Sequence, residues 1–275
     1  MTRKVSVVGV QTAPTDKPNA ENFADTLALM DDALGRYSHL DMVVLPEYFY
    51  EMDMSSPDRI GPYPDEVIGA MRARAIMYNT YIIAGTVINR REDGKLYNTA
   101  LLFDRKGEIV GSYDKIHMFD VLDCDGDDME SNFCRKGDSL FTYDADFGRI
   151  GISICYDIRF PELARIMALE GVSFLFVPSA FYSPRIDHWE KLLQALALQN
   201  SMYVTGVNLY GAWSPDHIFC GRSLIADPWG VTISQASDRA GCIHAYLDAA
   251  YADIVGDRTG SIRNRVDNVY EIHRK

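Results

Sequence analysis

The sequence is short of cysteine and of positive charge, and it has no long hydrophobic run. Its five cysteines are an odd number at irregular spacing and form no CxxC pair, which excludes a zinc ribbon and a disulfide framework. Lysine and arginine total 27 against 39 acidic residues, a net charge of −12, so nucleic acids and anionic membranes are not expected as partners. Glycine-rich phosphate loops of the GxGxxG or P-loop type are missing too, which argues against nucleotide-driven chemistry.

The N-terminal segment lacks the features of a targeting signal. "MTRKVSVVGVQTAPTD" has two basic residues but too short an apolar run for a signal peptide, and no membrane-spanning segment follows it. The chain is 47% hydrophobic over 275 residues and has no linker, repeat or low-complexity tract. We therefore expect a single domain covering residues 1–275, in a cytoplasmic protein.

Hydrophobic periodicity predicts alternating strands and helices, followed by strands without helices between them. In the first half, strands are predicted at 4–11, 41–46, 81–89, 97–104 and 108–115, and helices at 21–38 and 64–79. In the second half, strands are predicted at 150–154, 172–180, 202–208, 220–226 and 241–248, and helices at 160–171 and 187–200. This order indicates an α/β domain with mixed sheets and helices on their outer faces.

Three apolar strands lead directly into a residue that can take part in proton transfer or nucleophilic attack. "MVVLPE" ends at Glu47, "GSYDK" at Lys115 and "IGISIC" at Cys155. Ligand chemistry gathers beyond the carboxyl ends of strands, so the three side chains could converge on one pocket. Taken singly, each residue also fits an ordinary place: a solvated turn for the glutamate, the surface for the lysine, the core for the cysteine.

Together the three residues suit acyl transfer. A thiol attacks a carbonyl carbon as thiolate, and Glu47 could accept its proton and later activate water. Lys115 and the amide N–H of Tyr156 could hold the oxyanion, and the N-terminus of helix 160–171 would favour the thiolate. Three aromatic residues that follow strand ends are candidates for the pocket lining: Phe49, Phe181 and Tyr182.

Two other chemistries are considered and set aside. The acidic stretch 123–128 suggests calcium, but an EF-hand loop needs glycine sixth and glutamate twelfth, where Asp128 and Cys134 stand. We expect a solvated acidic loop and no metal. His117 or His188 could in principle pair with the cysteine as in papain, but we interpret His188 as a structural hydrogen-bonding residue.

Read together, "VVLPEYF", "YDKIHMFD" and "GISICYDIRFPELAR" resemble the three motifs of the nitrilase superfamily of carbon–nitrogen hydrolases. The resemblance continues through "VGVQTAP", "NTALLFDRKGEIVGSYDK", "HWEKLLQALALQN" and "GRSLIADPWG" to "RNRVDNVY", nearly the whole chain. It implies a four-layer αββα sandwich with the catalytic residues Glu47, Lys115 and Cys155. It also implies a second active-site glutamate, placed by "DMESNFCRKGD" at Glu130, which would bond the lysine or position substrate.

The resemblance further implies a reaction and an assembly. The cysteine would form a thioester with the acyl group of a small amide, ammonia would leave, and water would release the acid, with no cofactor. Family members commonly pair through helices next to the cysteine motif, so a homodimer or larger assembly is expected, with the tail at about 257–275 contributing to the contacts.

"CYDIRFPE" resembles the branch that cleaves small linear amides, with omega-amides favoured. An N-carbamoyl amidohydrolase and a nitrilase remain open because they share the same residues, and a catalytically silent binding module is a remote alternative. The helix 187–200 lacks the arginine that amidase-like relatives often carry there, which would alter a pocket wall or a dimer contact.

Overall fold

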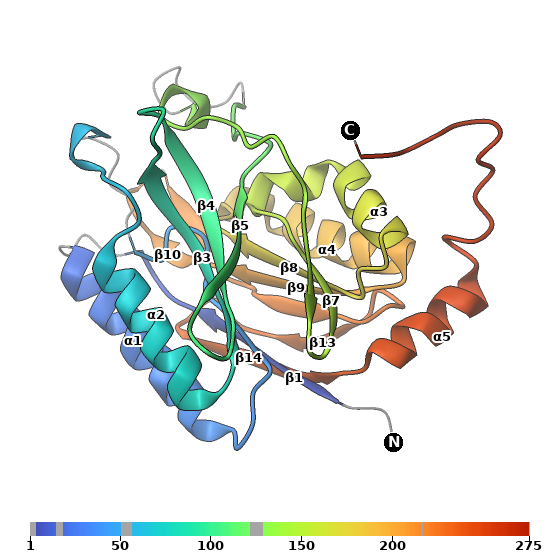
Figure 1. Ribbon diagram of the computed structural model, residues 1–275, viewed down its shortest axis with the longest axis horizontal. Coiled ribbons are helices and arrows are strands. Elements are labelled where there is room, and N and C mark those ends of the chain that lie inside the picture. Colours follow the sequence, from blue (N-terminus) through green and yellow to red (C-terminus); the bar gives the residue numbers. More distant parts are fainter. Residues whose placement is uncertain (1–3, 15–18, 51–56, 122–128, 216, 275) are drawn as a thin grey trace.

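The computed structural model describes residues 4–14, 19–50, 57–121, 129–215 and 217–274. Two six-stranded sheets pack face to face, and helices cover the outer face of each (Figure 1). The predicted αββα sandwich is therefore confirmed. No helix among these residues is long and apolar enough to cross a membrane.

The first sheet has the order β14-β1-β2-β3-β4-β5. Its strands are β1 Val5–Gln11, β2 Met42–Val44, β3 Tyr81–Arg90, β4 Leu96–Phe103, β5 Ile109–Asp114 and β14 Gly241–Leu247. Strands β1, β2 and β3 are parallel, while β4 runs antiparallel to both β3 and β5. As a result, β2 and β5 point the same way and end at the same edge of the sheet.

Helices α1 (Asn19–Arg36) and α2 (Asp65–Tyr78) cover the outer face of this sheet. The apolar side of α1 is buried there: Phe23, Met30 and Leu34 are each at most 5% exposed. Helix α2 ends at Asn79, whose left-handed φ of 50° closes the last turn.

The second sheet has the order β13-β12-β9-β8-β7-β6. Its strands are β6 Phe141–Ala145, β7 Gly148–Ile152, β8 Phe174–Ser179, β9 Tyr203–Asn208, β12 Leu224–Ala226 and β13 Thr232–Gln235. Strands β7, β8 and β9 are parallel. Helices α3 (Pro161–Leu169) and α4 (Ile186–Asn200) pack on the outer face, and Trp189 of α4 is fully buried.

The remaining elements are short or peripheral. The 3-10 helices are η1 Pro57–Arg59, η3 Glu130–Asn132, η4 Cys155–Arg159 and η5 Ser183–Arg185, and a separate hairpin pairs β10 Tyr210–Ala212 with β11 Ile218–Cys220. Helix α5 (Ala249–Thr259) starts at Asp248, whose carboxylate accepts from the Ala250 amide, and ends at Gly260. From there the tail loops outward and returns toward α3, where Arg274 donates to the carbonyl oxygen of Leu140 at 2.9 Å (Figure 1).

Apart from the 3-10 helices and the short β10–β11 hairpin, three elements were not predicted: β6, β13 and α5. Strands β6 and β13 are sheet edges with half-exposed residues, and α5 has a mixed surface with only Ala252 and Val255 buried. Edge strands and weakly amphipathic helices carry little of the periodicity on which a prediction from sequence depends.

Candidate active site

The carboxyl ends of strands from both sheets meet at one end of the sandwich. Glu47 follows β2 and Lys115 follows β5 in the first sheet, while Cys155 follows β7 in the second. Ala180, which follows the neighbouring strand β8, donates its amide N–H to Glu47 Oε2 at 2.8 Å. This bond joins the two sheets at the predicted residues.

Glu47 lies in a tight turn that depends on a glycine in the neighbouring strand. A Cβ atom on Gly85 of β3 would lie 2.1 Å from the carbonyl oxygens of Leu45 and Pro46, so a side chain there is sterically impossible without moving this turn. Tyr48, the next residue, takes a left-handed φ of 56° and donates its N–H to Thr86 Oγ1 at 3.0 Å. The backbone that carries Glu47 is therefore fixed by the geometry of this turn.

Lys115 stands between two buried carboxylates. Its Nζ lies 2.9 Å from Glu47 Oε1 and 2.7 Å from Glu130 Oε2, and the side chains of all three residues are at most 8% exposed. The Phe119 amide also donates to Glu130 Oε2 at 2.8 Å. The structure thus brings Glu47, Lys115 and Glu130 together, with two negative charges around one positive charge.

The sequence interpretation missed two residues of this cluster, Asn98 and Tyr48. Asn98 Nδ2 lies 2.8 Å from both Glu47 Oε1 and Glu130 Oε1. The Tyr48 hydroxyl donates to Glu130 Oε1 at 3.2 Å. The signal was faint: Asn98 is a fully buried polar residue within the apolar strand β4, and Tyr48 follows the predicted glutamate directly.

Cys155 begins the short helix η4 with a left-handed φ of 45°. Such a conformation strains a non-glycine residue and persists only where the surroundings hold it. Asp157 is the anchor, because its buried carboxylate accepts from the Ile154 amide at 2.9 Å, the Tyr113 hydroxyl at 2.7 Å and the His117 amide at 3.0 Å. Asp157, which the sequence interpretation also missed, therefore holds the turn that presents the thiol.

Burial governs the protonation of these groups. Burial raises the pKa of the Cys155 thiol well above its usual value of 9.0, the charge of Glu47 raises it further, and Lys115 only partly opposes them. Burial likewise raises the pKa of Glu47 above 4.5, against the opposing effect of Lys115. Burial lowers the pKa of Lys115, but the carboxylates of Glu130 and Glu47 more than offset this and hold it well above 10.5.

These directions correct one expectation. The N-terminus of the helix after the cysteine was expected to favour the thiolate, but α3 begins only at Pro161, beyond η4, and the thiol pKa is raised. The resting sulfur is a thiol beside the Glu47 carboxylate, and it needs a base in order to attack.

The structure places three of the aromatic residues predicted to bind substrate beside η4, β8 and α4, and places the fourth in the core. Tyr156 and Tyr182 contact the Phe119 ring at centroid distances of 5.3 and 5.7 Å, beside the backbone that binds Glu130, and Tyr156 lies in the first turn of η4. Phe181 is buried against the α4 residue Trp189 at 5.4 Å. Phe49 does not belong with them: it packs on Phe23 in the core under α1, because the turn at Tyr48 directs it to the other face of the sheet.

Neither histidine replaces the glutamate as a partner of the thiol. His117 Nδ1 lies 2.8 Å from Asp157, with its ring stacked on Phe160, and His188 Nδ1 lies 3.1 Å from Arg159 on the surface. Among the described residues, no group of three or more His, Cys, Asp or Glu side chains could hold a metal ion. The acidic stretch 123–128 lies outside the described residues.

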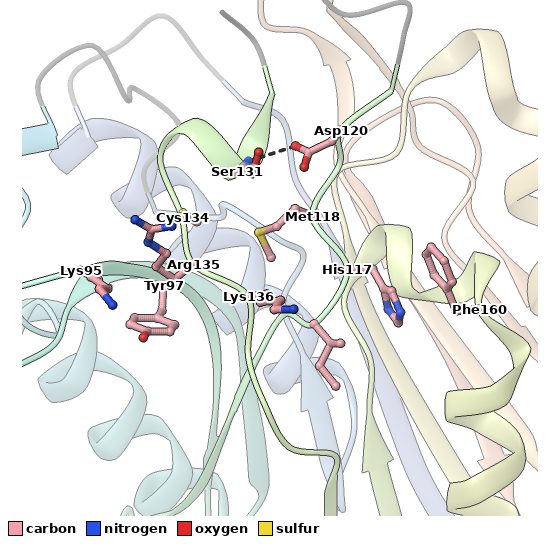
Figure 2. Close-up of a pocket in the computed structure, with 11 residues that line it drawn as sticks. Lys95, Tyr97, His117, Met118, Asp120, Ser131, Cys134, Arg135, Lys136 and Phe160 are labelled. Atoms are coloured by element: carbon pink, nitrogen blue, oxygen red, sulfur yellow. Dashed lines mark hydrogen bonds between the residues drawn. The ribbon is translucent and has the colours of Figure 1, made fainter. Parts of the chain in front are cut away.

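A cavity of about 540 Å³ is lined by residues of the segments that follow Lys115 and Glu130 (Figure 2). Its walls include His117 and Met118, which follow the lysine, and Ser131 and Lys136, which follow the second glutamate. Neither Glu47 nor Cys155 lines it. The segments that carry two of the charged residues therefore have one face in the cluster and another toward this cavity.

Comparisons with known proteins agree with the fold. The Caenorhabditis elegans nitrilase and fragile histidine triad fusion protein NitFhit is 32% identical over 242 residues, which are 85% of this chain and 55% of the fusion protein. Its crystal structure superimposes with a TM-score of 0.88 at 28% identity, covering 100% of this chain and 68% of that one. The chain thus spans about half the length of this relative.

Two relatives match over almost their whole length. The deaminated glutathione amidase of Synechocystis sp. is 34% identical over 268 residues, 93% of this chain and 94% of that enzyme. The omega-amidase NIT2 of Danio rerio is 30% identical over 267 residues, 94% of this chain and 93% of that enzyme. The carbon–nitrogen hydrolase family model matches residues 4–256, so this chain belongs to the carbon–nitrogen hydrolase family.

Proposed function

We propose that this enzyme hydrolyses the amide of a small linear molecule through a thioester on Cys155, releasing ammonia. The observation that carries the proposal is the buried Cys155 thiol beside Glu47, whose carboxylate is also paired with Lys115 at 2.9 Å. A nucleophile, a base and a cation gathered in one buried cluster are the groups that acyl transfer requires.

In the first half-reaction, Glu47 takes the thiol proton while the sulfur attacks the carbonyl carbon. The carbonyl oxygen becomes negative and is held by Lys115, which stays an ammonium because its pKa is raised, and by the N–H of Tyr156. Glu47 then gives the proton to the nitrogen, the C–N bond breaks, and ammonia leaves a thioester behind.

In the second half-reaction, Glu47 takes a proton from water, and the resulting hydroxide attacks the thioester. The C–S bond breaks, Glu47 returns the proton to the sulfur, and the carboxylic acid departs. Glu130 holds the lysine from the other side. The raised pKa of Glu47 suits this double role, since a base and acid works best when its pKa approaches the working pH.

We propose an omega-amide of a dicarboxylic acid as the substrate class. Support comes from "CYDIRFPE" and from the relatives named omega-amidase and deaminated glutathione amidase. The test is ammonia release from a panel of omega-amides, N-carbamoyl amino acids and short nitriles, with Cys155→Ser as the inactive control. Release from omega-amides is expected. Turnover of nitriles or carbamoyl compounds alone would move the enzyme to another branch, and silence on the whole panel would leave a binding module.

An acyl-enzyme test addresses the mechanism directly. Intact-protein mass spectrometry of the wild type, quenched in acid during turnover, should show the mass of the acyl group added at Cys155. Turnover with no adduct at any time, together with activity in the Cys155→Ser variant, would contradict the thioester.

We also propose a homodimer that pairs through α3, α4 and the C-terminal tail. Leu169 of α3 and Leu198 of α4 are 37% and 48% exposed, and Val269 in the tail is 75% exposed. Arg165 of α3 donates to the carbonyl oxygens of Gln199 and Ser261, which ties the three elements into one surface. Truncation after residue 260 should therefore turn a dimer into a monomer in light scattering; a dimer that survives the truncation would place the interface elsewhere.

A cytoplasmic location is proposed as well. The four described cysteines, at positions 134, 155, 220 and 242, are free thiols, which suits a reducing compartment. The net charge of −12 supports the absence of nucleic-acid and membrane partners. Cell fractionation should recover the protein with cytosolic markers.

A further inference from the structure

One residue outside the proposed catalytic set touches every charged member of it. The side-chain nitrogen of Asn98 lies 2.8 Å from an oxygen of Glu47 and 2.8 Å from an oxygen of Glu130. The carbonyl oxygen of the same residue accepts from the backbone N–H of Lys115 at 2.9 Å. Asn98 is fully buried in β4, the strand that pairs with the strand leading to the lysine.

This arrangement addresses an electrostatic problem. Two buried carboxyl groups share one ammonium, and the proximity of two acids favours protonation of one of them. Donated hydrogen bonds favour the ionised form without changing the net charge. The two N–H groups of Asn98 supply one such bond to each acid, and the bond to Glu47 acts against the effect of burial on its pKa.

The orientation of the amide indicates that this contact is not made for folding alone. Asn98 Oδ1 is buried and has no hydrogen-bond partner among the described residues. Such an acceptor is unfavourable, but the reversed amide would place its oxygen against two carboxylates. An apolar side chain of similar size would avoid the unpaired oxygen. The hydrogen bonds that the amide NH2 group donates to the two acids therefore explain why an asparagine stands here.

We propose that Asn98 is a positioning residue that fixes Glu47 and Glu130 on opposite sides of Lys115 and favours the ionised form of Glu47. The inference rests on the proposed function for its effect on rate. Asn98 is a neutral hydrogen-bond donor, and its bond to Glu47 sets the pH range in which Glu47 can act as the base.

The experiment compares Asn98→Asp, Asn98→Leu and a matched control, Asn89→Leu. Asn89 is also buried in the same sheet, but its amide donates to Thr99 Oγ1 at 2.7 Å and does not contact the acids. Activity of each folded variant is measured as ammonia release against pH, with circular dichroism to count folded molecules. A second readout needs no substrate: the rate at which iodoacetamide alkylates Cys155, followed by mass spectrometry across the same pH range.

Asn98→Asp is expected to lower kcat by about 100-fold or more at neutral pH, because a third carboxylate makes Glu47 harder to ionise. The acid limb of its pH–rate profile and its alkylation profile should both move to higher pH. Asn98→Leu should move them in the same direction by less, with little change in KM, while Asn89→Leu should keep the wild-type profiles.

The two hypotheses fail in different ways. Shifted alkylation profiles in an enzyme that turns over nothing would sink the proposed reaction and keep the positioning role. Unshifted profiles in both Asn98 variants, or an equal shift in Asn89→Leu, would overturn the positioning role even where amide turnover is robust.

Discussion

Strand β2 has a buried carboxylate at each end, and the two are used differently. Asp41 directly precedes the strand, and its carboxylate lies 2.6 Å from Arg105 Nη2 and accepts from the Ser6 amide at 2.9 Å. Glu47 follows the strand and shares Lys115 with Glu130, beside a thiol. Both side chains are at most 1% exposed.

The difference lies in the partners. At the first end, the cation is a guanidinium that stays charged, and the second acid that it contacts, Asp146, is 45% exposed to water. At the other end, both acids are buried with the lysine, and a proton can move between acid and thiol. In parallel strands the amino ends serve stability and the carboxyl ends serve chemistry, and here one strand shows both.

The largest effect is expected from removing the base. Glu47→Gln should lower kcat by about 10²- to 10⁴-fold, because the amide cannot accept the thiol proton. Ammonia release from the best substrate measures it, with circular dichroism to verify folding. A loss of less than tenfold would show that another group takes the proton.

At the other end of the strand, Asp41→Asn should reverse the pattern. Arg105 would keep Asp146 but lose its buried charge partner, and the Ser6 amide would lose a charged acceptor, so the free energy of unfolding should fall by about 1–3 kcal/mol. Activity per folded molecule should stay within about twofold of the wild type. Urea unfolding measures the stability of the variant, and ammonia release measures its activity. A variant as stable as the wild type but inactive would reverse the roles assigned to the two ends.

How far the sequence anticipates these two ends depends on the kind of signal. The sandwich and the strand-end residues Glu47, Lys115 and Cys155 follow from apolar runs and from motifs that stand at their ends. Asn98 was missed because its role depends on two acids brought in from distant segments. Phe49 was misplaced because the left-handed turn at Tyr48 cannot be read from an ordinary tyrosine.

A smaller effect concerns stability against pH. Burial raises the pKa of Glu47 above its value in the unfolded chain, so the native state binds the proton more tightly. The resulting stabilisation is complete below pH 4.5 and is lost as the pH rises through the raised pKa, by about 1.4 kcal/mol per unit of difference. Relative to the wild type, Glu47→Gln should therefore gain stability as the pH rises above 4.5.

Urea unfolding of the two proteins at matched pH values measures this difference. Titration of Lys115 does not interfere with this measurement. Its pKa is raised in the folded protein, so its contribution to the free energy of unfolding stays present below pH 10.5. A stability difference between wild type and Glu47→Gln that does not change with pH would mean that Glu47 has the same pKa folded and unfolded.

The smallest effect is expected at His188, the other candidate base from the sequence. Its ring lies beside Arg159 on the surface. It takes no part in the contacts described above for Asp41 or for Glu47. His188→Ala should therefore change kcat and the unfolding free energy little, within about twofold and about 0.5 kcal/mol. The acyl-enzyme on Cys155 should still form at the wild-type rate in rapid-quench mass spectrometry. Loss of that adduct in His188→Ala, with its survival in Glu47→Gln, would return the chemistry to a cysteine–histidine pair and leave Glu47 with a structural role like that of Asp41.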